Sequence, residues 1–194
     1  MEYELRTMVP ANVEYQTREE SGELYIEGYF AVFNSPYVIM DGVTEIVAPG
    51  AFSDTLGEDI RALTNHDTTL ILGRNKAGTL DLREDSHGLW SRIRVNQKDI
   101  DALNLYSRLS RGDVDQGSFG FYITDEERRV LDNGDVQYVI RKIRLIEVSV
   151  VTFPAYEATS VSARARQEED IRRRAFAERK EKLRGLLKGA SETC

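Results

Sequence analysis

Histidine and cysteine are scarce in this 194-residue chain, and their scarcity limits its chemistry. The single cysteine, Cys194, excludes a disulfide within the chain and argues against a zinc site built from thiolates. No apolar run approaches the roughly 20 residues that a membrane-spanning helix needs. The first residues also lack the basic and apolar regions of a signal peptide, so we expect an intracellular protein. Because ligand residues are so few, we expect neither a metal nor an organic cofactor.

Positive charge is short in most of the chain and abundant near its C-terminal end. Residues 164–194 hold ten Lys/Arg against six Asp/Glu, a net charge of +4, whereas residues 1–163 hold 16 against 27, a net of −11. The acidic body argues against a direct role in nucleic-acid binding. Residues 167–188 are dense in Glu, Arg, Lys and Ala, which predicts a helix with a thin apolar stripe. We therefore expect a body of residues 1–163 and a basic helical tail of residues 164–194.

Most of the body has the pattern of β structure. Residues 24–33 are rich in aromatic and β-branched side chains, which are typical of strands. Residues 79–83 and 89–95 alternate on either side of a turn, which predicts a hairpin. The Asn133-Gly134 step predicts a second hairpin that leads into residues 136–140.

Helices are expected to be few and short. One is predicted around residues 52–56 and another over residues 99–109, where apolar side chains recur at helical spacing before Gly112. The many evenly spaced strands show no alternation with long helices. We therefore expect a mainly β fold with helices (α+β), in which short helices surround a closed β-barrel.

The shortage of histidine narrows the choice of a catalytic base to two residues. His87 lies in a turn and is predicted to be exposed and structural, whereas His66 follows a short apolar stretch. Ser118 lies later in the chain, in a strand pattern that contains two glycines and two phenylalanines. A serine hydroxyl becomes a good nucleophile when a base removes its proton, and histidine is the usual base near neutral pH. The candidate pair is therefore His66 and Ser118.

Strand alternation predicts which way Ser118 faces. Ser118 and Gly120 share one face of the strand, while Phe119 and Phe121 point to the opposite face, which we expect to be the core. This arrangement predicts an exposed serine nucleophile. The alternative is an ordinary strand serine near a turn, and His66 could equally be a surface turn residue.

A carboxylate is the third candidate. Glu147 is the only acidic residue in the strongly strand-like segment of residues 143–153. Burial of an ionised carboxylate is costly unless it is paired, and a histidine that it orients is one suitable partner. An ion pair with Arg141 or Arg144 is the alternative.

A family resemblance connects these observations. The motifs that carry it occur in order as Gly28-Tyr29-Phe30-Ala31-Val32-Phe33-Asn34-Ser35-Pro36, Ala48-Pro49-Gly50-Ala51-Phe52, Asn65-His66-Asp67, Leu72-Gly73-Arg74, Gly78-Thr79-Leu80, Gly88-Leu89, Gly117-Ser118-Phe119-Gly120-Phe121 and Glu147-Val148-Ser149-Val150-Val151-Thr152-Phe153-Pro154-Ala155. Together they closely resemble the prohead (capsid maturation) serine protease family of tailed bacteriophages and prophages, over residues 3–160.

The resemblance implies an assemblin-like β-barrel peptidase, because the family is similar to the herpesvirus assemblins. It implies activity inside the assembling procapsid in the host cytoplasm, on scaffold segments of the capsid protein precursor and often on the enzyme itself. It leaves self-association open. The expected reaction is acyl transfer by a serine endopeptidase; the alternative function is a non-catalytic scaffold or chaperone for capsid assembly built on the same barrel.

The resemblance also assigns residues. The family's histidine corresponds to His66 and its serine to Ser118, both on matching motifs. Herpesvirus relatives use a second histidine as the third residue, and this chain has none on the corresponding late strand. We therefore assign Glu147 to that role, with Asp67 as the alternative.

Overall fold

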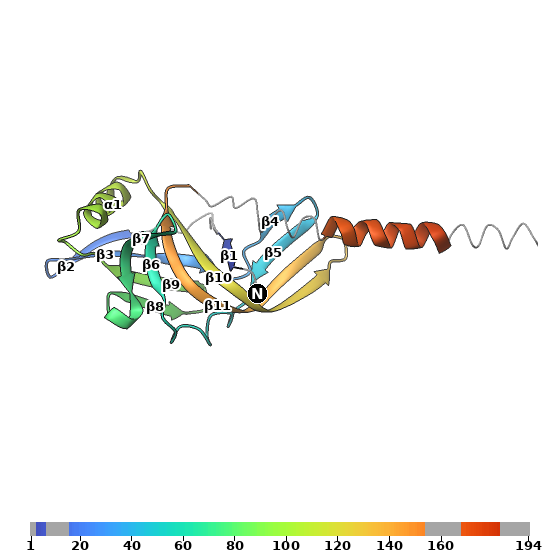
Figure 1. The fold of residues 1–194 in the computed structure, drawn as a ribbon, viewed down its shortest axis with the longest axis horizontal. Helices are drawn as coiled ribbons and strands as arrows, with labels where there is room; N and C mark the ends of the chain where they lie inside the picture. The colour runs from blue at the N-terminus through green and yellow to red at the C-terminus, as the bar shows by residue number, and fades with distance from the viewer. Residues whose placement is uncertain (1–2, 7–15, 154–167, 183–194) are drawn as a thin grey trace, which may run out of the picture. The chain divides into compact units, whose positions relative to one another are not determined.

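The computed structural model describes residues 3–6, 16–153 and 168–182 (Figure 1). The chain forms two compact units, Met1–Tyr156 and Glu157–Cys194. Within the described residues, the first unit is mainly β with few helices, and the second contains a helix over residues 168–182. No helix of these described parts has both the length and the apolar character needed to cross a membrane.

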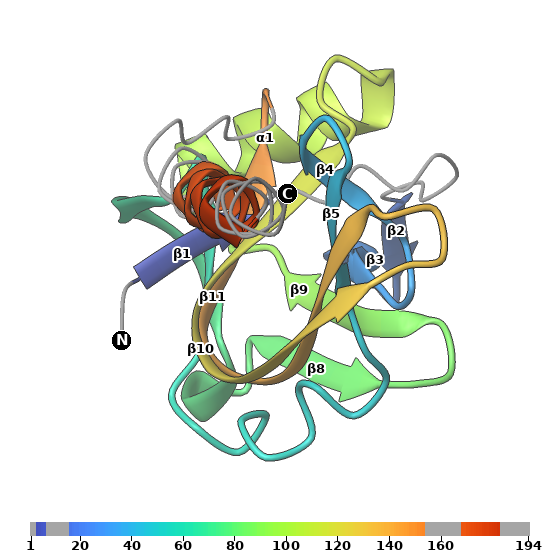
Figure 2. The ribbon, with the colours of Figure 1, turned by 90° about the vertical axis from the view of Figure 1, so that its right-hand side faces the viewer.

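A long, curved hairpin organises the larger of two sheets. Strands β10 (Gln116–Val130) and β11 (Val136–Val151) pair antiparallel along their length, and they bend together around one side of the unit (Figure 2). The turn that joins them contains Gly134 with φ +89°, which confirms the hairpin predicted there. Strand β1 (Tyr3–Arg6) pairs with the opposite edge of β10.

Strand β11 is long enough to pair with two short parallel strands in succession. Strand β5 (Val43–Val47) lies along the beginning of β11 and strand β6 (Arg61–Thr64) along its end. Strands β4 (Tyr37–Met40) and β7 (Asp67–Arg74) then pair with β5 and β6, respectively. The β6–β7 turn is thereby brought to the end of β11.

The smaller sheet has the strand order β2, β3, β9, β8. Its strands are β2 (Gln16–Glu20), β3 (Glu23–Val32), β8 (Leu80–Glu84) and β9 (Gly88–Arg94). The β8–β9 pairing confirms the first predicted hairpin. The short 3-10 helix η1 (Asn75–Ala77) joins β7 to this sheet.

The core lies between the two sheets and is closed by helix α1 (Ile100–Arg111). The larger sheet contributes the stacked rings of Phe119 and Phe121, whose centroids are 4.8 Å apart. The fully buried core residues of the smaller sheet include Ile26, Phe30, Leu89 and Ile93.

Helix α1 confirms the helix predicted over residues 99–109. The Asp99 carboxylate accepts hydrogen bonds from the backbone N–H groups of Asp101 and Ala102, and Gly112 ends the helix in the left-handed conformation. Its apolar face, formed by Ala102, Leu105 and Leu109, is buried.

Two sequence-based expectations about the body are wrong. Neither sheet of the described residues closes into a barrel, because no hydrogen-bonded pairing joins the edge strands of one sheet to those of the other. Residues 52–56 form successive turns and no helix. Bonds from Thr55 N–H to the Phe52 carbonyl and from Glu58 N–H to the Thr55 carbonyl close these turns, while the Glu84 carboxylate accepts the N–H groups of Gly50 and Phe52.

The second unit agrees only partly with the tail expected from the sequence. Residues 168–182 are helical, and the apolar side chains of Ile171 and Phe176 are exposed. The remaining residues of the predicted helix, 167 and 183–188, lie outside the described residues.

Candidate active site

His66 lies in a tight turn between β6 and β7. Thr64 and Asp67 pair directly with one another, so Asn65 and His66 alone form the loop. Both have left-handed backbones, with φ of +52° and +59°. This is the conformation of a type I′ hairpin turn, in which asparagine is favoured at the first position.

Four hydrogen bonds fasten the turn to the end of β11 and the residue that follows it, one of them from Asn65 Nδ2 to Thr152 Oγ1 at 3.4 Å. The Asn65 N–H donates to the Val150 carbonyl at 2.9 Å, and the Asn65 side-chain carbonyl accepts the Thr152 N–H at 2.8 Å. The His66 N–H donates to Ser149 Oγ at 3.2 Å. The backbone that carries the imidazole is therefore held directly over the strand that carries Glu147.

The imidazole of His66 contacts the carboxylate of Glu147. Nδ1 of His66 lies 2.7 Å from Oε1 of Glu147, and the two side chains are 14% and 4% exposed. An ionised carboxylate accepts hydrogen bonds and donates none, so Nδ1 carries the proton of this bond. When the imidazole is neutral, its lone pair is then on Nε2.

That second nitrogen is buried and, among the described residues, has no hydrogen-bond partner. An unsatisfied buried polar atom costs about 1–3 kcal/mol, and such atoms are few in native structures. The imidazole is thus oriented at one nitrogen and left with a free acceptor at the other.

Ser149 completes this cluster, and its role was not foreseen from the sequence. Its hydroxyl donates to Oε2 of Glu147 at 2.6 Å, so the two carboxylate oxygens have different partners. The i, i+2 spacing of Glu147 and Ser149 on one strand predicts a shared face and is the signal that could have identified it. Nothing local in the sequence indicates that Asn65 binds Thr152.

Ser118 lies on the neighbouring strand, directly opposite Ser149 in the β10–β11 register. Directly opposed residues of an antiparallel pair share a face of the sheet, so Ser118 lies on the same face as the cluster. Gly120 is opposite Glu147 and adds no side chain above the carboxylate. His66 at the end of β6, Glu147 on β11 and Ser118 on β10 therefore converge at this face of the sheet.

The environment of Ser118 differs from the prediction in one respect. Phe119 and Phe121 are in the core as expected, but Ser118 is completely buried and not exposed. β11 pairs with one edge of β10 at this residue, and β1 begins to pair with the other edge at Phe119. Since Nε2 of His66 has no partner in the described part of the chain, no hydrogen bond joins it to the Ser118 hydroxyl.

Asp67, Arg141 and Arg144, the alternatives to the pairing of His66 with Glu147, have other partners. The Asp67 carboxylate accepts the hydroxyl and the N–H of Thr69, and these bonds hold the pKa of Asp67 below its ordinary value. Arg141 pairs with Asp125 and Glu127, and Arg144 pairs with Glu58. His87 is exposed, as predicted, and its ring packs against Tyr29.

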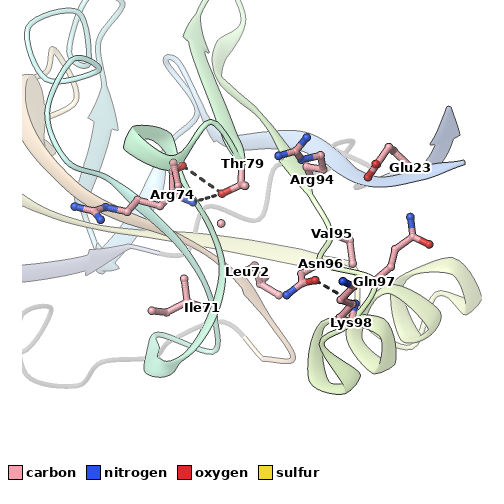
Figure 3. Close-up of a pocket in the computed structure, with 12 residues that line it drawn as sticks. Glu23, Ile71, Leu72, Arg74, Thr79, Arg94, Val95, Asn96, Gln97 and Lys98 are labelled. Atoms are coloured by element: carbon pink, nitrogen blue, oxygen red, sulfur yellow. Dashed lines mark hydrogen bonds between the residues drawn. The ribbon is translucent and has the colours of Figure 1, made fainter. Parts of the chain in front are cut away.

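No group of three or more His, Cys, Asp or Glu side chains within the described ranges is arranged to hold a metal ion. A pocket of about 640 Å³ lies beside β7 and the segment before α1, with Arg74, Arg94 and Lys98 among the residues that line it (Figure 3). His66, Ser118 and Glu147 do not line this pocket. None of these three residues lies in β7, although the turn that carries His66 leads into that strand.

A family model and a curated relative show which family the chain resembles. A family model described as caudovirus prohead serine protease matches residues 11–174. The chain is 31% identical over 141 residues to the prohead protease of Enterobacteria phage HK97, and the match covers 71% of this chain and 58% of that protein. The solved structure of the bacteriophage T4 capsid assembly protease is similar with a TM-score of 0.45 and 13% identity, over 77% of this chain and 96% of that one.

Proposed function

The chain belongs to the caudovirus prohead serine protease family, and on this basis we propose that it is a serine endopeptidase of capsid maturation. Its proposed substrates are scaffold segments of the capsid protein precursor, together with the enzyme itself. The proposed place of action is the interior of the procapsid as it assembles in the host cell. The chain spans 58% of the length of the HK97 protease, so activity, substrates and partners are all part of the proposal.

The proposed mechanism is acyl transfer through Ser118, His66 and Glu147. The Ser118 oxygen attacks the substrate carbonyl while Nε2 of His66 takes the hydroxyl proton. His66 then returns that proton to the leaving amine, and water releases the acyl group from Ser118 by the same steps. Glu147 keeps the proton on Nδ1 and stabilises the imidazolium that forms.

The observation that carries the proposal is the state of the His66 ring. A 2.7 Å contact to a buried carboxylate fixes one nitrogen, and the other is buried without a partner in the described residues. A general base requires this arrangement, because its free nitrogen must accept the proton of the nucleophile. Ser118 lies on the same face, and hydrogen bonds of the catalytic kind often tighten only when substrate binds.

The proposal is tested by the cleavage of a purified capsid protein precursor by the full chain. The Ser118→Ala variant is expected to lose at least about 10⁴-fold in rate, because its nucleophile is absent, and to keep the melting temperature of the wild type. A variant that cleaves the precursor at near the wild-type rate would refute the assignment. If the wild-type chain promotes assembly without cleaving any precursor, it acts as an assembly scaffold and the enzymatic proposal is wrong.

A further inference from the structure

We propose that Ser149 is the positioning residue of this site, because it holds the carboxylate of Glu147 and the backbone of His66 in register with one another. Only the expected effect of Ser149 on kcat rests on the proposed peptidase function. Ser149 does not contact the substrate in this account; it acts through Glu147 and His66.

The direction of each hydrogen bond at Ser149 is fixed by chemistry. A backbone N–H can only donate, so the Ser149 oxygen must accept from His66 at 3.2 Å. An ionised carboxylate can only accept, so the Ser149 hydrogen must point to Oε2 of Glu147 at 2.6 Å. The Ser149 hydroxyl is thus committed in one orientation, which also makes it a poor nucleophile in its own right.

The location of Ser149 explains why one residue can serve both partners. In β11 it is opposite Ser118 of β10 on one side and Leu63 of β6 on the other. The β6 strand leads into the turn that carries His66, and Glu147 precedes Ser149 by two residues on the same face. Ser149 is therefore the point at which the three contributing strands meet.

Burial makes the loss of either hydrogen bond of Ser149 costly. Ser149 is fully buried and the Glu147 side chain is 4% exposed, so water has little access to replace a lost bond. Without the hydroxyl, one carboxylate oxygen and the His66 N–H would each lose this partner. The carboxylate could then rotate away from Nδ1, and the left-handed turn would lose one of the hydrogen bonds that fasten it to the end of β11.

The test compares Ser149→Ala with Ser91→Ala in the full chain. Ser91 is a matched control because it is a fully buried strand serine whose hydroxyl has no partner among the described residues. Ser149→Ala is expected to lower kcat on the order of 10–100-fold, the size typical of outer-shell partners, with KM nearly unchanged. Ser91→Ala should leave both constants near those of the wild type.

Nitrogen NMR of histidine-labelled protein gives a readout that does not depend on activity. The wild type should show the proton of His66 on Nδ1, and His87→Gln removes the only other histidine signal. Ser149→Ala should weaken or shift this Nδ1 proton signal, whereas Ser91→Ala should not. Ser149→Cys fills the same space with a weak donor and should behave like Ser149→Ala, so it carries the test if the alanine variant does not fold.

Two results would overturn the proposal. One is an unchanged Nδ1 signal together with an unchanged kcat in both Ser149 variants. The other is an equal effect of the Ser91 and Ser149 substitutions. Failure of the proposed function itself would look different: the Nδ1 signal would still respond to Ser149→Ala, but wild-type protein would cleave no precursor.

Discussion

The contact between His66 and Glu147 sets the chemistry at the scale of single residues. The shortage of histidine was enough to nominate His66, and Glu147 was nominated as the only carboxylate in the strand-like segment of residues 143–153. Their 2.7 Å contact depends on β6 pairing in parallel with the last part of β11. That pairing is non-local and could not be derived from the residues around either side chain.

Replacement of Glu147 by glutamine separates an orienting role from a merely structural one. The amide cannot accept at both atoms, so it favours the imidazole tautomer with the proton on the wrong nitrogen. We expect activity on a capsid precursor to fall by roughly 10⁴-fold while the melting temperature stays near that of the wild type.

Asp67→Asn is the comparison for this variant, because the Asp67 carboxylate bonds to Thr69. It should retain nearly full activity. If Asp67→Asn loses as much activity as Glu147→Gln, or if Glu147→Gln remains active, the assignment of Glu147 is wrong.

The complete burial of Ser118 was not predicted, and the reason is also non-local. Alternation along β10 correctly separates Ser118 from the core-facing phenylalanines. It cannot show that β11 and β1 flank this part of the strand. The same limit applies to Ser149, whose partners are known only once the turn and the strand are brought together.

At the scale of elements, predictions succeeded where the signal is local. The two hairpins and helix α1 were found because glycine turns, strand alternation, helical spacing of apolar side chains and the Gly112 stop lie within or beside each element. No helix forms at residues 52–56: the Ala51 carbonyl, which a helix would pair with the Thr55 N–H, accepts the N–H of Ile143, a residue distant in the sequence.

Gly88 illustrates a backbone contact that the elements require. A Cβ atom at this position would lie 1.9 Å from the carbonyl oxygen of Ala31, at the pairing of β9 with β3. Gly88→Ala should therefore force the strands apart and lower the free energy of unfolding by roughly 1–3 kcal/mol or more.

Gly57→Ala provides the control, because a Cβ at Gly57 would meet no atom within 4 Å. Urea denaturation of both variants measures the difference. Equal stability of Gly88→Ala and the wild type would mean that β3 and β9 do not approach as closely as described.

At the scale of the whole molecule, the sequence correctly indicated a mainly β body but wrongly indicated that its strands close into a barrel. Barrel closure depends on which strand edges meet, and the hydrophobic pattern of a strand reports its faces and not its edges. Charge also divides the chain, with a net of −11 over residues 1–163 and +4 over residues 164–194.

We predict that the basic tail of residues 164–194 is separable from the peptidase body. Exposed charge pairs contribute about 0–1 kcal/mol each and weaken with salt, so charge attraction alone should not make the tail part of the body. Truncation after Ala163 should leave hydrolysis of a short peptide nearly unchanged and reduce incorporation into proheads. Unfolding, or loss of peptide hydrolysis, would assign the tail to the catalytic domain.

The most direct test of the central claim is labelling of the full chain with a fluorophosphonate, followed by mass-spectrometric mapping of the modified residue. A serine activated by a neighbouring base should react selectively, so the adduct is expected on Ser118. Labelling should disappear in His66→Gln and persist in His87→Gln, which removes the exposed histidine. An adduct on Ser149 or another serine, or labelling of Ser118 that does not require His66, would contradict the account.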